Sequence, residues 1–139
     1  MNKYDLIYVS TLTAISDTLQ IFYENKSIFG YNYLKNKCQQ TTRLTHLILP
    51  DLKEQSGKLF EQKHCWNYDP QNNIIIDLSA WQFGNNISPN KFVFDKNYTH
   101  YQEYKFNEKN LEDYKNNIKT NNHELEELLK IYNQIKSGY

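Results

Sequence analysis

The sequence lacks any run of about twenty apolar residues, the length that a membrane-spanning helix requires. Its first residues also lack the basic segment and apolar stretch of a secretory leader. Net charge is absent as well, since 16 basic and 16 acidic residues balance to zero and Arg43 is the only arginine. Nucleic-acid-binding proteins usually carry a basic surplus with several arginines. We therefore expect a cytoplasmic protein that binds neither nucleic acid nor membrane, although an exported effector is also compatible with the sequence.

Cysteine, glycine and proline are scarce, with two, four and three copies in 139 residues. Two cysteines rule out a disulfide-rich scaffold, and in a reducing compartment Cys38 and Cys65 would both be thiols. Hydrophobic residues make up 39% of the chain and aromatic residues 15%, which argues against a disordered or fibrous protein. A chain of this length can fold without cross-links. We expect one domain over residues 1–139, with no cofactor indicated and no indication of oligomeric state.

Apolar residues at helical spacing predict three helices. The first runs from about Ser10 to Glu24 and is followed by a loop over residues 25–37. The second runs from Cys38 to Leu49 and ends because Pro50 cannot continue it. In this second helix Leu44, Leu47 and Ile48 are expected on one flank. The third helix forms the tail, and its expected buried stripe consists of Leu125, Leu128, Leu129, Tyr132 and Ile135.

Aromatic and β-branched residues predict two strands in the middle of the chain, Lys63–Tyr68 and Ile74–Leu78, joined by a tight turn over Asp69–Asn72. Shorter strands are expected around residues 58–60 and 92–94. The resulting fold class is α+β: helices, one of which carries a cysteine at its start, pack on a small antiparallel sheet, and a C-terminal helix follows.

The predicted hairpin register brings two ionisable side chains together. With the turn at residues 69–72, Tyr68 faces Asn73, Trp66 faces Ile75, and His64 falls opposite Asp77. Directly opposed residues place their side chains on the same face of the sheet, with Cβ atoms about 5 Å apart. A carboxylate that binds one ring nitrogen of a histidine leaves the other nitrogen to act on a nucleophile.

Cys38, at the expected start of the second helix, is the candidate nucleophile, because a helix N-terminus and a nearby imidazolium both favour the reactive thiolate. The backbone N–H of Cys38 and a second donor would form an oxyanion hole. Asn32 and Gln39 are the nearest side chains that could supply this donor. Trp66 would share a face with His64 and could line the cleft, although tryptophan more often lies in a core. The neighbouring Cys65 should point to the opposite face from His64 and is interpreted as a packing residue.

Three motifs in this order resemble a known family. Residues Cys38–Thr42, His64–Asn67 and Asp77–Phe83 match the pattern of the YunG-like family of small bacterial proteins, which runs Gly-Gln-Cys with a Thr-rich helix, His-Tyr-Trp-Asn, and Asp-Leu-Thr-x-x-Gln-Phe. The order also resembles the transglutaminase-like branch of the papain-like superfamily. The resemblance covers roughly residues 30–83. It departs before the cysteine, where this chain has Asn36-Lys37, and after the helix, where Pro50 replaces glycines. The resemblance implies a papain-like or transglutaminase-like core.

The same residues also allow other interpretations. Cys38 alone could be a small core residue, and a zinc site from Cys38, His64 and Asp77 is chemically plausible. Zinc sites usually contain closely spaced ligand pairs such as CxxC, which this sequence lacks. His46 lies two helical turns from Cys38 and is too distant to act as its base. His100 and His123 lie in polar segments and are expected at the surface.

The favoured hypothesis is a cysteine-dependent acyl-transfer enzyme with a Cys38–His64–Asp77 triad that acts on a protein, peptide or small amide substrate. If water resolves the acyl-enzyme, the protein is an amidase, deamidase or peptidase; if an amine does, it is a transferase. Two alternatives remain open at this point. The chain could be a binding or regulatory module that keeps the fold without turnover, or a transglutaminase-like or acyltransferase-like effector.

Overall fold

The computed structural model describes residues 3–24, 37–83, 86–88, 91–103 and 122–138. Within these residues the fold is α+β, with three α-helices and a curled five-stranded antiparallel sheet. The elements are α1 (Lys3–Glu24), α2 (Cys38–Ile48), β1 (Lys53–Leu59), β2 (Gln62–Asp69), β3 (Ile74–Ile76), the 3₁₀ helix η1 (Ala80–Phe83), β4 (Val93–Asp95), β5 (Tyr101–Glu103) and α4 (Asn122–Ser137). The loop expected over residues 25–37 lies almost entirely outside the described residues.

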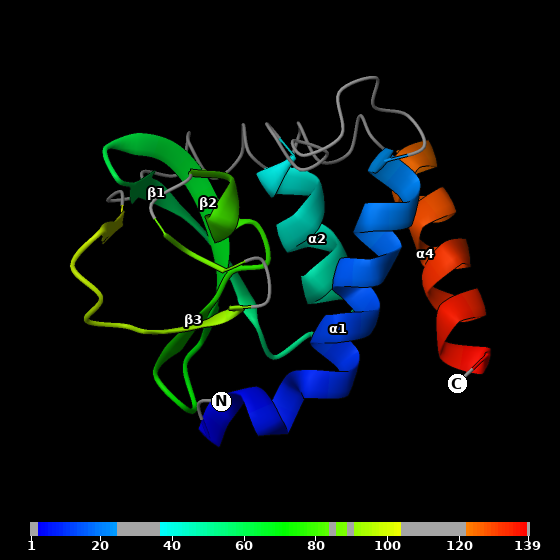
Figure 1. The fold of residues 1–139 in the computed structure, drawn as a ribbon, viewed down its shortest axis with the longest axis horizontal. Coiled ribbons are helices and arrows are strands. Elements are labelled where there is room, and N and C mark those ends of the chain that lie inside the picture. The colour runs from blue at the N-terminus through cyan, green and yellow to red at the C-terminus, as the bar shows by residue number, and fades with distance from the viewer. Residues whose placement is uncertain (1–2, 25–36, 84–85, 89–90, 104–121, 139) are drawn as a thin grey trace.

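The helices gather on one side of the sheet. In Figure 1, α2 lies beside the sheet, while α1 and α4 lie next to each other farther from it. Helix α1 begins at Lys3, seven residues before the predicted start, because no glycine or proline interrupts the stretch from Lys3 to Ser10. Its buried side chains follow a helical spacing and face the core as predicted: Leu12, Ile15, Leu19 and Phe22.

Helix α2 begins at Cys38 as predicted and ends at Ile48, two residues before Pro50. Its packing differs from the expected apolar flank, because Leu47 is 42% exposed. The buried side of the helix is instead largely threonine, with Thr41, Thr42 and Thr45 beside Leu44. The hydroxyls of Thr41 and Thr45 donate hydrogen bonds to the carbonyls one turn earlier, at Lys37 and Thr41, so these polar side chains can be buried without an unsatisfied donor.

The sheet order is β4-β3-β2-β1-β5, with every neighbouring pair antiparallel. Strand β1 is longer than the short strand expected at residues 58–60, and it pairs with β2 along its whole length. Gly57 allows the edge strand β5 to approach closely, since a Cβ at this position would lie 2.0 Å from the Gln102 carbonyl oxygen and 2.6 Å from the Trp66 ring. Strand β1 thus has β5 on its other side.

The β2–β3 hairpin differs from the predicted register by two residues. Asp69 pairs with Ile74 and Tyr68 with Ile75, so the predicted pairing of Tyr68 with Asn73 was wrong. The turn is displaced because the Asp69 carboxylate accepts hydrogen bonds from the backbone N–H groups of Gln71 and Asn72, which makes Asp69 the last strand residue instead of the first turn residue. A shift of two leaves each side chain on its predicted face, whereas a shift of one would not.

Two apolar clusters lie on the two faces of the sheet. Ile74 and Ile76 join the core beneath the helices, whereas Ile75 between them faces the other way. Inside the curl of the sheet, Ile75 packs with four other buried residues: Leu59, Trp66, Ala80 and Phe94. Residues of β2 alternate in the same manner, so Cys65 and Asn67 share the helix-facing side while His64 and Trp66 face the interior of the curl.

Helix α4 packs against α1 and buries part of its predicted stripe. Leu125, Leu128 and Tyr132 are buried, whereas Leu129 and Ile135 are half-buried. In the parts of the chain that the structure describes, no helix combines the length and the apolar character needed to cross a membrane.

Candidate functional site

A buried histidine–carboxylate pair lies where β2 passes the end of β3. His64 Nε2 is 2.7 Å from Asp77 Oδ2, and each side chain is only 1% exposed. In the observed register His64 is offset diagonally from Asp77, which lies one residue beyond the end of β3. The two side chains still meet because the shift of two residues kept them on one face and a diagonal neighbour is within reach of a long side chain. The structure therefore brings together the predicted imidazole and carboxylate.

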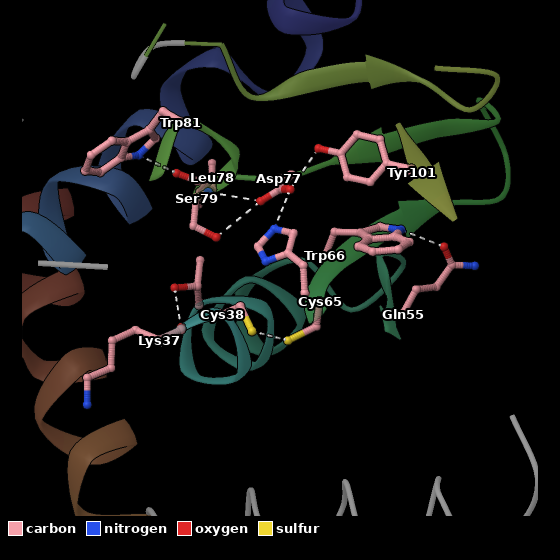
Figure 2. Close-up of polar contacts among 12 residues, drawn as sticks. Lys37, Cys38, Gln55, Cys65, Trp66, Asp77, Leu78, Ser79, Trp81 and Tyr101 are labelled. Carbon is pink, nitrogen blue, oxygen red and sulfur yellow. Dashed lines mark hydrogen bonds and ion pairs between the residues drawn. The ribbon is translucent and has the colours of Figure 1, made fainter. Parts of the chain in front are cut away.

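The Asp77 carboxylate is held from several sides (Figure 2). Its Oδ1 accepts hydrogen bonds from the Ser79 backbone N–H at 3.0 Å and from the Ser79 hydroxyl at 3.3 Å. Its Oδ2 accepts a hydrogen bond from the Tyr101 hydroxyl at 2.8 Å, in addition to that from His64. The burial of Tyr101 and the charge of Asp77 raise the pKa of its hydroxyl far above the ordinary value, so Tyr101 stays protonated and donates. These contacts hold the carboxylate in one orientation toward His64.

Sequence reasoning did not identify either of these supporting residues. Ser79 had a detectable signal, because an aspartate two residues before a serine is a common arrangement for a local side-chain-to-backbone hydrogen bond. Tyr101 had none. It is 24 residues from Asp77 and reaches the carboxylate only because β5 adds to the far edge of a sheet that curls back.

Cys38 occupies the first position of α2, and its helix end has no side-chain cap. The preceding residue, Lys37, directs its ammonium group over the Tyr23 ring, at 5.3 Å from the ring centroid. The backbone N–H groups in the first turn of a helix have no partner within that helix and carry a partial positive charge. Because Cys38 is the first residue of α2, it lies beside these N–H groups, which stabilise an anion. Cys38 is only half-buried and is therefore not fully enclosed in the core.

The second cysteine lies directly against the first. Cys65 Sγ donates a hydrogen bond to Cys38 Sγ across 2.7 Å, and Figure 2 shows the two sulfurs directed toward each other. Cys65 reaches this position because it is on the helix-facing side of β2, and α2 packs on that strand through a hydrogen bond from Asn67 to the Thr42 carbonyl. Cys65 is buried, as a packing residue would be, but its contact with Cys38 was not foreseen.

The electrostatics of the site favour a thiolate at Cys38. The hydrogen bond from Cys65, with a smaller contribution from the nearby charge of His64, lowers the pKa of Cys38 to about 5 against the opposing effect of burial. The same contact raises the pKa of Cys65, which also loses solvation. Burial lowers the pKa of His64, but the charge and hydrogen bond of Asp77 and the proximity of Cys38 outweigh it, raising this pKa to about 9. Between these values the favoured state is a Cys38 thiolate beside a His64 imidazolium.

The two ring nitrogens of His64 have different surroundings. Nε2 is occupied by Asp77, whereas Nδ1 is buried and makes no hydrogen bond of good geometry to any described residue. Cys38 is nevertheless near enough that each group shifts the pKa of the other. Nδ1 is therefore the only ring nitrogen that could exchange a proton with the sulfur. A long or poorly aligned contact of this kind is common in catalytic sites without substrate.

The predicted supporting residues have varied outcomes. Asn32 lies outside the described residues. Gln39 is half-buried in the first turn of α2, next to Cys38. Trp66 is fully buried and donates its ring N–H to the Gln55 amide oxygen at 2.9 Å, so it belongs to the core and does not line an accessible cleft. Phe83, from η1, packs edge-on against the His64 ring at 4.7 Å.

The remaining histidines lie outside this site. His46 Nδ1 is 2.7 Å from the Leu52 carbonyl oxygen, and His100 is exposed and stacks on Phe60. His123 is exposed on α4. Among the residues that the structure describes, no group of three or more His, Cys, Asp or Glu side chains is arranged to hold a metal ion.

Comparison of the chain with sequence models of protein families, with curated proteins and with solved structures gave no match in any of the three.

Proposed function

We propose that the chain is a cysteine-dependent acyl-transfer enzyme with a papain-like or transglutaminase-like core, of the YunG-like kind. The observation that carries this proposal is the buried 2.7 Å contact between His64 and Asp77 beside a cysteine at an uncapped helix N-terminus. Burial of a histidine–carboxylate pair is costly, and such a pair next to a perturbed thiol is typical of a catalytic site. The order of the three residues along the chain supports the same assignment.

Each residue has a distinct role in the proposed mechanism. The Cys38 thiolate attacks the carbonyl carbon of an amide, forming a C–S bond and an oxyanion. The His64 imidazolium gives its Nδ1 proton to the leaving nitrogen, the C–N bond breaks, and a thioester remains on Cys38. Water or an amine then attacks the thioester while Nδ1 takes its proton, and the thiolate leaves. Asp77 keeps Nε2 protonated and orients the ring.

The first turn of α2 provides the means to stabilise the oxyanion. Its backbone N–H groups are not capped by a side chain, and the helix dipole adds to their positive potential. Gln39 adds an amide in the same turn. The proposed substrate is accordingly an amide or thioester-like carbonyl of a protein, a peptide or a small amide.

A test uses p-nitrophenyl acetate as a generic acyl donor. The reduced wild-type protein should release a burst of about one equivalent of p-nitrophenol per chain and then turn over, since a covalent intermediate splits the reaction into two steps. Mass spectrometry should find the acetyl group on the tryptic peptide that contains Cys38, and Cys38→Ala should abolish the burst although the variant still folds.

The matched control for this test is Asp77→Asn, which preserves the shape of the side chain but favours the wrong His64 tautomer. It should slow deacylation by about 10²–10⁴-fold, the range expected when general acid–base catalysis is lost. Equal deacylation rates in Asp77→Asn and wild-type protein would show that acetylation is only ordinary thiol chemistry. If deacylation is slower in Asp77→Asn, ammonia release from glutamine peptides would indicate a deamidase, and incorporation of an amine would indicate a transferase.

A second candidate function is a binding or regulatory module without turnover. It is favoured by one observation: His64 Nδ1 makes no hydrogen bond of good geometry to Cys38, whose sulfur is instead bonded to Cys65. A module of this kind would show no turnover with any acyl donor.

A further inference from the structure

The contact between the two cysteines is not used by the acyl-transfer mechanism. That mechanism needs one sulfur beside His64, yet the chain places its only two sulfhydryl groups together on different elements, 27 residues apart in sequence. Neither sulfur is bonded to the other as a disulfide in the structure. The Sγ–Sγ distance of 2.7 Å is about 0.7 Å longer than the S–S bond of a disulfide. A small movement of the two side chains is thus enough to join them.

The two cysteines differ in the properties that matter for oxidation. Cys38 is half-buried, whereas Cys65 is only 4% exposed, so Cys38 is the more accessible of the two. Reaction with peroxides follows thiolate character and access, so the first of the pair to react is Cys38. Cys65 is the nearest sulfur and is held on β2 directly against α2, 2.7 Å from the sulfur that it would attack.

We propose that Cys38 and Cys65 form a peroxide-responsive pair, in which a hydroperoxide oxidises Cys38 and Cys65 resolves the product to an intramolecular disulfide. This inference goes beyond the proposed acyl transfer and does not need it, because the oxidation requires only the two sulfurs and a hydroperoxide.

The proposed oxidation of the cysteine pair has two steps. The Cys38 thiolate attacks one peroxide oxygen, an S–O bond forms, the O–O bond breaks, and the departing hydroxide takes a proton to become water. Sulfur is thereby oxidised by two electrons to a sulfenic acid, and the peroxide is reduced. The Cys65 sulfur then attacks the Cys38 sulfur, an S–S bond forms, the S–O bond breaks, and the hydroxyl leaves as a second water with the Cys65 proton.

Oxidation of Cys38 favours the later attack by Cys65. The pKa of Cys65 is raised above all by its hydrogen bond to the Cys38 sulfur, and the charge of Cys38 contributes to this shift. A sulfenic acid is neutral at this sulfur, so both effects weaken once Cys38 has been oxidised. Cys65 then becomes easier to deprotonate at the moment when its attack is required. In the disulfide Cys38 has no thiolate, so any reaction that uses this thiolate as its nucleophile stops.

The experiment follows the disulfide directly. Reduced wild-type protein is treated with about one equivalent of hydrogen peroxide, blocked with an alkylating agent, and digested with trypsin. Cleavage after Lys37, Arg43, Lys63 and Lys91 separates the cysteines into peptides 38–43 and 64–91. We expect a protein mass lower by about 2 Da and a single cross-linked peptide pair, both reversed by dithiothreitol.

The single-cysteine variants serve as controls. In Cys65→Ser the oxidised Cys38 has no resolving partner, so a sulfenic acid and then a sulfinic acid, about 32 Da heavier than the thiol, should accumulate. In Cys38→Ser the buried Cys65 should stay reduced. Formation of sulfinic acid without a cross-link in the wild-type protein would overturn the proposal, as would two unmodified thiols. Absence of acyl transfer in the reduced protein, when peroxide still forms the cross-link, would instead refute only the acyl-transfer mechanism.

Discussion

The hydrogen bond from Cys65 lowers the pKa of Cys38, and this effect can be measured by replacing Cys65. Cys65→Ser keeps a hydroxyl donor next to the Cys38 sulfur and leaves one thiol in the chain, whereas Cys65→Ala removes the donor. Because the hydrogen bond from Cys65 is the strongest influence that lowers the pKa of Cys38, the pKa should remain low in the serine variant and rise by at least about one unit in the alanine variant.

The difference in reactivity between Cys38 and an ordinary thiol depends strongly on pH. At pH 5.5 a thiol with a pKa of about 5 is about three-quarters ionised, whereas an ordinary thiol with a pKa of 9.0 is about 0.03% ionised. The less basic thiolate is intrinsically slower, by about 40–100-fold for a pKa lower by four, given a Brønsted slope of about 0.4–0.5. At pH 7 the two effects nearly cancel, so a single rate measured there decides nothing. At pH 5.5 Cys38 should still react about 20–60-fold faster than an ordinary thiol.

The assay is therefore a pH profile of iodoacetamide labelling, read by mass spectrometry on the peptide 38–43 under anaerobic conditions. Wild-type and Cys65→Ser proteins should reach half of their maximal rate near pH 5, and Cys65→Ala well above it. A wild-type midpoint between 8 and 9 would refute the thiolate assignment. Equal low midpoints in the serine and alanine variants would show that Cys65 is not the cause.

Three further changes test the site and the fold. Because the pKa of Cys38 is lowered on folding, its thiolate makes the free energy of unfolding rise as the pH increases from about 5 to 9. Because the pKa of His64 is raised on folding, its imidazolium makes the free energy of unfolding fall as the pH increases from 6.5 to about 9, so the two effects nearly cancel above pH 6.5. Cys38→Ser removes the rise, so its free energy of unfolding in urea should fall above pH 6.5 by up to about 1.4 kcal/mol per pH unit, unlike the nearly flat wild type. Tyr101→Phe keeps the ring but not the hydrogen bond to Asp77, and should lower the free energy of unfolding by about 1–3 kcal/mol and slow deacylation; unchanged values would remove Tyr101 from the site. Gly57→Ala should destabilise the fold by about 3 kcal/mol or more in the same assay, and an effect below about 0.5 kcal/mol would contradict the close approach of β5.

Much of the site could be predicted because it depends on short-range pattern. The strand-like segments on either side of an aspartate-led turn predict a hairpin, and side-chain alternation along it puts His64 and Asp77 on one face for any register of the same parity. This is why an error of two residues in the register did not separate them. In the same way, Pro50 sets a limit to α2 within two residues of its observed end.

Interactions between distant elements were beyond such reasoning. The apolar flank predicted for α2 included Leu47, which is exposed, because threonines that satisfy their own hydroxyls can form the buried side of a helix. The extra length of β1 was missed for a related reason. Its residues Lys53–Leu59 are mostly polar and become a strand through pairing with β2 on one side and β5 on the other.

The sequence by itself determined which groups the site contains and the faces on which they lie, because helical spacing and strand alternation are local properties of the backbone. Only the tertiary structure decided how α2 is placed on β2, and that placement puts the Cys65 sulfur against Cys38. It also decided that the curled sheet brings Tyr101 to Asp77. Such contacts depend on the packing of elements far apart in the chain, for which neighbouring residues carry no signal.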